Sequence, residues 1–304
     1  MASDHLLLSI LYTRIGKKAT MDLTSLAQVK NLLHKYNAYP SKGMGQNFLI
    51  NKKILQTIVK AANLDPKDSV LEVGPGIGIL TQELARQVKQ VTAIEKDKNM
   101  VEILKETMKD YPNVNIIQDD ILKISNLKFQ ISNSVYKVVA NIPYYLTSPL
   151  IRKLLESPHQ PQEIILMVQK EVAQRIAAAP PHMNLLAVAV QCYATPKIIS
   201  YVSKECFWPA PKIDSAIIRI TPIQQSKDIS YEKFFRIVRA GFSQPRKQLA
   251  NNLSQKLKMN REEVEVWLSK NNINPKQRAE TLTIKDWEGL THSEQKFHTR
   301  EKPG

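Results

Sequence analysis

Residues Asn141 to Tyr144 read Asn-Ile-Pro-Tyr, a motif whose residue types suit chemistry on an aromatic amine. The exocyclic nitrogen of adenine is a poor nucleophile because its lone pair is delocalised into the ring. A site that methylates such a nitrogen needs acceptors for both amine protons, so that the nitrogen can become tetrahedral as it attacks. The Asn141 side-chain oxygen and the Ile142 carbonyl can be these acceptors, because Pro143 keeps the preceding residue extended. Tyr144 can stack on the flipped base, although a proline turn with a half-buried tyrosine is the structural alternative.

A glycine-rich turn, Gly74-Pro75-Gly76-Ile77-Gly78, follows the apolar run 70–73. The pattern predicts a strand, a tight turn and a helix. Gly74 and Gly76 let the backbone approach a ligand without a Cβ in the way, and the N-terminus of the helix suits a carboxylate or a phosphate. By itself the turn is also compatible with an ordinary strand-to-helix connection.

An acidic residue, Glu95, follows the next predicted strand, 91–94, and stands 21 residues after Gly74. At this spacing a carboxylate can reach both ribose hydroxyls of a nucleoside, which fits a dinucleotide or S-adenosylmethionine. The dinucleotide form Gly-x-Gly-x-x-Gly is not met, because Ile79 occupies the place of the third glycine. Glu72 instead precedes the turn in the pattern Glu-x-Gly-x-Gly-x-Gly. The sequence therefore favours S-adenosylmethionine over a nicotinamide dinucleotide.

The third predicted strand, residues 114–118, is followed by a pair of acids, Asp119 and Asp120. A carboxylate there can accept a hydrogen bond from an adenine amine, because ligands bind outside the carboxyl ends of parallel strands. We predict that Asp120 is this acceptor and that Asp119 is merely solvated.

The loop 41–49 has a composition suited to covering a ligand. It contains two glycines, a basic residue, the amides Gln46 and Asn47, and an aromatic residue. Such a loop could fold over a molecule bound at the Gly74 turn. A plain linker packed by Phe48 explains the same composition.

Strands alternate with helices through most of the chain. We predict strands at residues 70–73, 91–94, 114–118, 136–140 and 163–169, and an antiparallel pair at 197–202 and 213–220. Helices are expected at 24–36, 52–62, 77–87, 97–108, 170–179 and 185–193. This alternation predicts an α/β fold with a mainly parallel, Rossmann-like sheet covered by helices on both faces.

From residue 223 onward the pattern contains helices alone, expected at 231–242, 246–257, 262–270 and 284–294. Residues 223–260 hold eight lysines and arginines but only two acids. A basic helical appendage suits RNA phosphates, with Arg246 and Lys247 as candidate contacts, although a solvated face fits the composition equally well. We therefore predict a variable N-terminal extension at 1–23, a Rossmann-like domain at 24–222 and a helical domain at 223–304.

The composition narrows the class of protein. A chain of 304 residues, 43% of them hydrophobic, can bury a large core as an ordinary soluble globular protein does. Its formal charge of +15 favours a polyanionic partner, because neutralising phosphates releases counterions. Cys192 and Cys206 lack metal-ligand spacing, which argues against a disulfide framework or a zinc site and for a reducing, cytoplasmic compartment.

The apolar run 6–11 is too short to span a bilayer and lacks the features of a signal peptide, although the basic segment 1–20 also fits a presequence.

Six stretches occur in one order along the chain: GQNFL (45–49), LEVGPGIGILT (71–81), IEKD (94–97), NIPYYLTSPL (141–150), FWPAPKIDSAIIRI (207–220) and QPRKQLANNL (244–253). They resemble the KsgA/RsmA family of S-adenosylmethionine-dependent ribosomal RNA adenine dimethyltransferases. The resemblance implies that the methyl donor contacts Asn47, Leu49, Gly74, Glu95, Asp120 and Asn141, to which we add Gln46 and Gly76. It also implies that Asn141 to Tyr144 hold the target adenine, with Phe207 as a second aromatic residue nearby.

The resemblance further implies an activity. Two methyl groups are transferred to N6 of each of two adjacent adenosines in a hairpin of the small-subunit rRNA, during ribosome biogenesis. The expected partner is the pre-30S particle, and the expected state is a monomer that needs neither a metal nor a membrane. We assign no general base, because the proton can leave to solvent after the attack.

Two other functions are compatible with parts of the sequence. A large-subunit rRNA methyltransferase shares the Asn-Ile-Pro-Tyr motif, but FWPAPKIDSA and RAETLT (278–283) favour the small-subunit type. A non-catalytic RNA-binding factor on the same fold would tolerate decay of the donor site, whereas these residues are intact here. One departure stands at Met183-Asn184-Leu185, where the family usually has a Tyr-Gly pair, and it affects the expected start of the helix 185–193.

Overall fold

The structure is a computed structural model and describes residues 21–41, 43–124, 135–225 and 228–294. The expected N-terminal extension lies outside the described residues except for residues 21–23. The first described helix, α2 (Leu26–Lys35), buries Val29, Leu32 and Leu33. These residues lie three or four positions apart or side by side, so they share one face of the helix. None of the described helices is long and apolar enough to cross a membrane.

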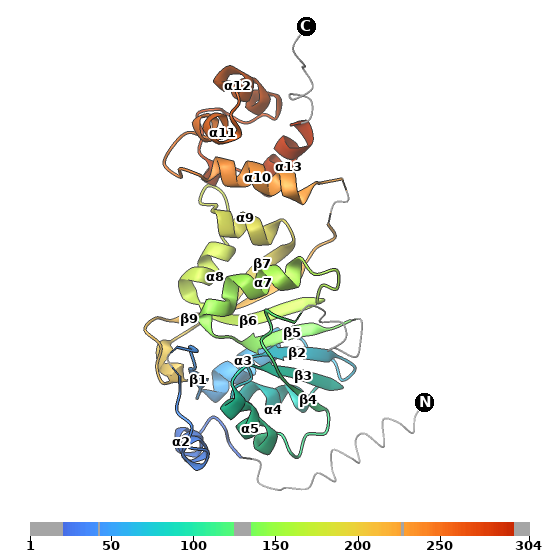
Figure 1. The fold of residues 1–304 in the computed structure, drawn as a ribbon, viewed down its shortest axis with the longest axis vertical. Helices are drawn as coiled ribbons and strands as arrows, with labels where there is room; N and C mark the ends of the chain where they lie inside the picture. Colours follow the sequence, from blue (N-terminus) through green and yellow to red (C-terminus); the bar gives the residue numbers. More distant parts are fainter. Residues whose placement is uncertain (1–20, 42, 125–134, 226–227, 295–304) are drawn as a thin grey trace, which may run out of the picture.

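A seven-stranded sheet forms the centre of the molecule (Figure 1). From one edge to the other its strands are β4 (Val114–Gln118), β3 (Gln90–Glu95), β2 (Ser69–Val73), β5 (Lys137–Asn141), β6 (Glu163–Gln169), β9 (Ser215–Pro222) and β7 (Ala194–Val202). Strands β2 to β6 are parallel, and β9 is antiparallel to both of its neighbours. The predicted parallel sheet, finished by an antiparallel pair, is therefore confirmed. The chain order reverses between β2 and β5, which is the switch point where such sheets bind ligands.

Helices cover both faces of the sheet (Figure 1). Successive strand residues point to opposite faces, so Val138 packs into one hydrophobic core and Val139 into the other. The first core includes residues of α7 (Thr147–Leu155), α8 (Lys170–Ile176) and α9 (Leu185–Gln191). The second core includes residues of α3 (Lys52–Ala61), α4 (Ile79–Ala85) and α5 (Lys98–Thr107). The sheet is thus buried on both sides, and its strand ends are left to form a site.

Helix α7 follows the Asn-Ile-Pro-Tyr motif and is not predicted from the sequence. A short 3₁₀ turn, η1 (Tyr144–Leu146), leads into it, and the Thr147 hydroxyl donates to the Tyr144 carbonyl at 2.9 Å. Pro149 stands in the first turn of α7, where the helix needs no N–H from it. The 3₁₀ turn begins at Tyr144, so the extended backbone of the motif ends there and α7 continues the chain from Thr147.

The departure at Met183-Asn184-Leu185 leaves the start of α9 intact. Asn184 is the N-cap residue, and its side-chain oxygen accepts from the Ala187 N–H at 3.0 Å. Its amide nitrogen donates to the Arg175 carbonyl at 2.9 Å. The Met183 N–H donates to the Glu280 carbonyl at 2.9 Å, which ties this turn to the C-terminal helices.

A second, two-stranded sheet joins segments that are far apart in the chain. Strand β1 (Phe48–Leu49) pairs antiparallel with β8 (Phe207–Trp208), and Leu49 lies opposite Phe207. The Ile50 N–H donates to the Cys206 carbonyl at 2.8 Å. This pairing brings the loop 41–49 to Phe207, and so unites two of the predicted site segments.

The described residues of the C-terminal part form the α-helices α10 (Tyr231–Gly241), α11 (Leu249–Leu257), α12 (Arg261–Lys270) and α13 (Ile284–Ser293). Figure 1 shows them at one end of the molecule, beyond α9. They share a hydrophobic core with the first face of the sheet, and the ring of Tyr193 stacks on that of Tyr231 at 4.7 Å between centroids. The division of the chain at residue 222, where β9 ends, stays a prediction.

Helix α11 begins at Leu249, three residues later than predicted. Gln248 is extended, with φ −61° and ψ 146°, and the Leu249 N–H donates to the Gln277 carbonyl at 2.8 Å. A tertiary hydrogen bond therefore fixes the start of the helix, which periodicity alone does not reveal. Arg246 and Lys247 lie in the exposed turn between α10 and α11.

Candidate active site

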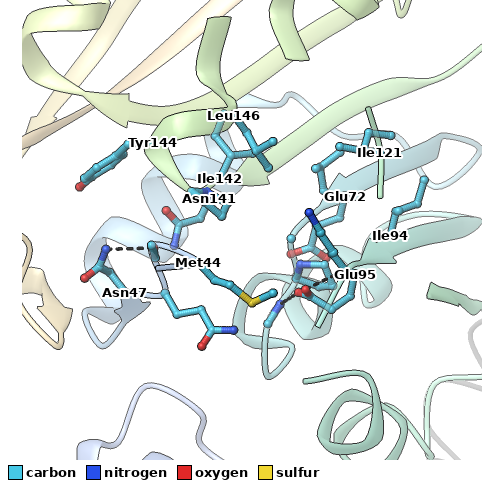
Figure 2. Close-up of a pocket in the computed structure, with 18 of the residues that line it drawn as sticks. Met44, Asn47, Glu72, Ile94, Glu95, Ile121, Asn141, Ile142, Tyr144 and Leu146 are labelled. Atoms are coloured by element: carbon cyan, nitrogen blue, oxygen red, sulfur yellow. Dashed lines mark hydrogen bonds between the residues drawn. The ribbon is translucent and has the colours of Figure 1, made fainter. Parts of the chain in front are cut away.

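A cleft that is partly open to solvent lies at the carboxyl ends of β2, β3 and β5. It is lined by all twelve residues predicted for the donor and the base: Gln46, Asn47, Leu49, Gly74, Gly76, Glu95, Asp120, Asn141, Ile142, Pro143, Tyr144 and Phe207. Figure 2 shows the Asn141 side chain between Tyr144 on one side and Glu72 and Glu95 on the other. Arg246 and Lys247 are not among the lining residues.

The glycine turn packs tightly against two other segments of the cleft. Gly74 has φ +67° and Gly76 has φ +58°, values that L side chains rarely adopt. A Cβ on Gly74 would lie 3.3 Å from Pro143 Cδ, and one on Gly76 would lie 3.3 Å from Phe48 Cε1. Both the backbone conformation and the available space therefore favour glycine, because the turn packs against Pro143 of the Asn-Ile-Pro-Tyr motif and against Phe48.

Glu95 ends β3 and is only 7% exposed. Its Oε2 accepts from the Gly76 N–H at 3.0 Å, and its Oε1 accepts from the N–H groups of Lys96 and Asp97 at 2.8 and 2.9 Å. Burial raises the pKa of Glu95, while these three N–H groups act in the opposite direction. The carboxylate is thus fixed in place, and Oε2 keeps acceptor capacity for a further donor.

Both acids after β4 line the cleft, and within the part of the chain that the structure describes Asp120 is the one held by a cation. Its Oδ2 pairs with Lys96 Nζ at 3.0 Å, and its Oδ1 accepts from the Leu122 N–H at 3.0 Å. Burial opposes the charge of Asp120, yet Lys96 and the Leu122 N–H keep the pKa of this carboxyl below its usual value. Lys96 is a lining residue that sequence reasoning missed, although it stands between Glu95 and Asp97 in a quoted motif.

Side-chain hydrogen bonds hold the described part of the loop 41–49, Ser41 and residues 43–49, at the cleft. The Gln46 side chain donates to Asp97 Oδ2 at 2.9 Å and accepts from the Ser41 N–H at 2.8 Å. Asn47 donates to the Gly45 carbonyl at 3.1 Å. In Figure 2 the Met44 side chain, which sequence reasoning missed, also points into this space. The loop therefore contributes to the cleft and is more than a linker.

The motif at the end of β5 forms the other side of the cleft. Asn141 is held by the sheet opposite Met167 of β6, and in Figure 2 its side chain forms no hydrogen bond with the other residues drawn. The Tyr144 hydroxyl lies 2.7 Å from Ser215 Oγ. Burial raises the pKa of Tyr144, while Ser215 acts in the opposite direction. Phe207 is 3% exposed, so it presents little of its ring to the cleft.

Glu72 also lines the cleft, and sequence reasoning named it only as the start of the glycine pattern. It is 1% exposed, and its Oε2 has no hydrogen-bond partner in the described part of the chain. Burial raises the pKa of Glu72 to about 8. The Thr81 hydroxyl lowers this pKa, and the nearby charge of Glu95 raises it further. A carboxyl group that is costly to ionise therefore lies beside Glu95 (Figure 2).

We expect Glu72→Gln to stabilise the protein increasingly as the pH rises. The folded state holds the Glu72 proton more tightly than the unfolded chain does. The stability that this proton contributes to the folded state is therefore complete below pH 4.5 and is lost as the pH rises towards 8. Glutamine cannot ionise, so the variant should gain up to about 3 kcal/mol over the wild type between pH 5 and pH 8.5. Denaturant unfolding at both pH values measures the difference, with the exposed Glu102→Gln as control. An equal difference at both pH values would contradict the expectation.

The family model for ribosomal RNA adenine dimethylase matches residues 40–295. The chain belongs to this family. It is 42% identical over 274 residues to ribosomal RNA small subunit methyltransferase A of Dehalococcoides mccartyi, covering 90% of this chain and 94% of that protein. The protein of the same description from Bacillus licheniformis is 40% identical over 284 residues, which cover 89% of this chain and 96% of that protein.

Two solved structures share the fold. A dimethyladenosine transferase from Plasmodium falciparum has a TM-score of 0.69 at 27% identity and covers 82% of this chain and 97% of its own. The 23S rRNA methyltransferase ErmE has a TM-score of 0.66 at 27% identity, and the match covers 81% of this chain and 98% of that chain. The chain is therefore a Rossmann-like methyltransferase with S-adenosylmethionine as donor and adenine of ribosomal RNA as substrate. The predicted family, fold class, enzyme class and cofactor are confirmed.

Proposed function

We propose that this methyltransferase acts in ribosome biogenesis on two adjacent adenosines in a hairpin near the 3′ end of small-subunit rRNA, placing two methyl groups on N6 of each. The observation that carries this proposal is the meeting of the Asn-Ile-Pro-Tyr motif and the Glu95 donor site in a single cleft. The choice of the small subunit is supported by relatives that are 40–42% identical and are described as small-subunit enzymes. ErmE, described as a 23S enzyme, is more distant at 27%.

In the donor half of the cleft, Glu95 accepts hydrogen bonds from the ribose hydroxyls, using the acceptor capacity that remains on its fixed carboxylate. Asp120 accepts from the adenine amine, and the Lys96 ion pair keeps it charged for this role. Gly74 and Gly76 let the backbone approach the donor. The side chains of Gln46, Asn47 and Leu49 enclose it from the loop. The sulfonium of the donor is a good leaving group, so the protein supplies position and electrostatics.

In the acceptor half, the Asn141 side-chain oxygen and the Ile142 carbonyl accept the two protons of the target amine. Pro143, with φ −55° and ψ 134°, fixes the turn that follows. Tyr144 stacks on the flipped adenine, and the edge of Phe207 limits the space around it. As the nitrogen attacks the methyl group it becomes tetrahedral, and its proton leaves to solvent after the transfer.

The helical part, residues 223–304, is proposed as a separate RNA-contacting domain beside the methyltransferase domain, 24–222. Arg246 and Lys247 are suited to phosphates because they are exposed in the turn between α10 and α11. The partner is the pre-30S particle, on which the protein acts as a monomer in the cytoplasm.

Replacing both Arg246 and Lys247 with alanine should weaken RNA binding and leave binding of S-adenosylhomocysteine intact. Each lost phosphate contact removes one released counterion, so the slope of log affinity against log salt should become shallower by about one per contact. Filter binding to the rRNA hairpin between 50 and 200 mM salt measures this slope. Lys98→Ala with Lys105→Ala, on α5 at the other end of the molecule, is a control of equal charge change (Figure 1). Equal slopes for the two double variants would exclude this turn as a phosphate contact.

The proposed substrate is tested by incubating the protein and methyl-labelled S-adenosylmethionine with unmethylated 30S subunits, with 50S subunits and with the naked RNAs. Label in the 30S sample alone supports the proposal. Label in the 50S sample points to the large-subunit alternative. RNA binding without any label points to the non-catalytic factor.

A further inference from the structure

Ser215, outside the predicted site, holds the ring that is proposed to stack on the target base. It is the first residue of β9, is 0% exposed, and lies opposite Gln169 of β6 and Val202 of β7. Its Oγ lies 2.7 Å from the Tyr144 hydroxyl. Since β6 separates β5 from β9 in the sheet, this hydrogen bond reaches from the end of β5 across the end of β6. Three strands therefore fix the anchor of one aromatic ring.

The neighbouring residue, Asp214, supports the segment that leads to the second aromatic ring. Its side chain accepts from the Lys204 N–H at 3.1 Å, at the start of the 3₁₀ turn η2 (Lys204–Cys206), which Phe207 directly follows. Its carbonyl accepts from the Lys170 N–H at 3.0 Å, at the start of α8. Asp214 thus links the end of β6, the start of β9 and the segment before Phe207.

We propose that Asp214 and Ser215 are positioning residues that set the relative placement of Tyr144 and Phe207 on either side of the target adenine. This inference rests on the proposed function of those two rings. Adjacent residues of an extended segment point in opposite directions, so one short stretch can reach both rings, Ser215 directly and Asp214 through η2. Neither residue touches the donor half of the cleft, because neither lines it.

The physical reason is preorganisation of the base site. A tyrosine ring held only by its own torsions samples several orientations, whereas one whose hydroxyl is anchored to a buried serine keeps one. Methyl transfer needs the amine nitrogen in line with the methyl group, and small misplacements lower the rate steeply. Loss of the anchor should therefore lower kcat by about three- to tenfold, while the KM for RNA and the binding of S-adenosylhomocysteine stay unchanged.

A double-mutant cycle on Tyr144 and Ser215 tests the proposal. Ser215→Ala and Tyr144→Phe each remove the same hydrogen bond, the second one without changing the buried end of β9. We expect both single variants to lose the same factor in kcat under single-turnover conditions, and the double variant to lose no more than either. Losses that multiply in the double variant, or wild-type kcat in Tyr144→Phe, would overturn the proposal.

Asp214 is tested with a matched pair of variants. Asp214→Ala removes the acceptor for the Lys204 N–H and should lower kcat by a similar factor. Asp214→Asn keeps an acceptor oxygen there and should restore most of the loss. Equal kcat values for the two variants would remove Asp214 from the proposal. A wild-type protein that transfers no methyl group contradicts the proposed function itself, whereas an active wild type with unaffected variants contradicts only this inference.

Discussion

Asn141→Ala should lower the rate of methyl transfer by about 100- to 1000-fold while the protein still binds its donor and its RNA. The Asn141 oxygen accepts an amine proton as the nitrogen becomes tetrahedral, and this interaction strengthens only towards the transition state. The loss of one such preorganised group typically costs this factor in rate. Because the ground state is affected less, kcat should fall more than KM rises.

Single-turnover methylation of the rRNA hairpin measures this effect, with calorimetry to verify that S-adenosylhomocysteine still binds. Asn141→Asp is the matched control, because it keeps an acceptor oxygen at the same place and should retain more activity than the alanine variant. The sheet pairing of Asn141 with Met167 is made by the backbone, so both variants keep it. An alanine variant that dimethylates adenosine at close to the wild-type rate would place the chemistry elsewhere and favour the binding-factor alternative.

Glu95→Ala should weaken donor binding by about 1–3 kcal/mol, the range for losing hydrogen bonds to a charged acceptor. This corresponds to roughly 5- to 150-fold in the dissociation constant of S-adenosylhomocysteine. Part of this loss of affinity comes from a hydrogen bond within the protein and not from the ribose. In the variant the Gly76 N–H no longer has its Glu95 acceptor at 3.0 Å, so the glycine turn is fixed less firmly in the conformation that binds the donor. Calorimetry on the wild type and the variant measures the change.

Two comparisons separate the contribution of the ribose from that of the turn. Glu95→Gln keeps one oxygen for the backbone N–H groups and should lose less affinity than Glu95→Ala. An S-adenosylhomocysteine analogue without the two ribose hydroxyls should lose less affinity on Glu95→Ala than S-adenosylhomocysteine does, and the loss that remains is the contribution of the turn. A wild-type affinity of the alanine variant for S-adenosylhomocysteine contradicts the assignment of Glu95.

The central sheet and the order of the site segments could be predicted because their signals are local. The strands predicted from apolar segments of four to seven residues correspond to β2 to β6, and the glycines of the turn predicted where β2 ends. Since the carboxyl ends of parallel strands meet at one edge, the residues that follow these strands had to share a cleft. Asp97, predicted as the start of a helix, is the N-cap of α5.

The contacts between distant segments could not be predicted in the same way. Strands β1 and β8 have two residues each, too few for any periodicity, and only their pairing places Phe207 beside Leu49. The hydrogen bond from Gln46 to Asp97 spans 51 residues, and that between Tyr144 and Ser215 spans 71. Helix α11 starts late because Leu249 bonds to Gln277, a partner that no local pattern reveals. Tertiary hydrogen bonds of this kind decide the geometry of the cleft.

The most direct test of the account is mass spectrometry of the rRNA nucleosides after unmethylated 30S particles are incubated with the protein and isotope-labelled S-adenosylmethionine. The account predicts N6,N6-dimethyladenosine with both methyl groups labelled, at two adjacent positions near the 3′ end of the small-subunit rRNA, and its absence with Asn141→Ala. Dimethyladenosine at other positions, label on an atom other than N6, or no label with a protein that binds both donor and particle would contradict it.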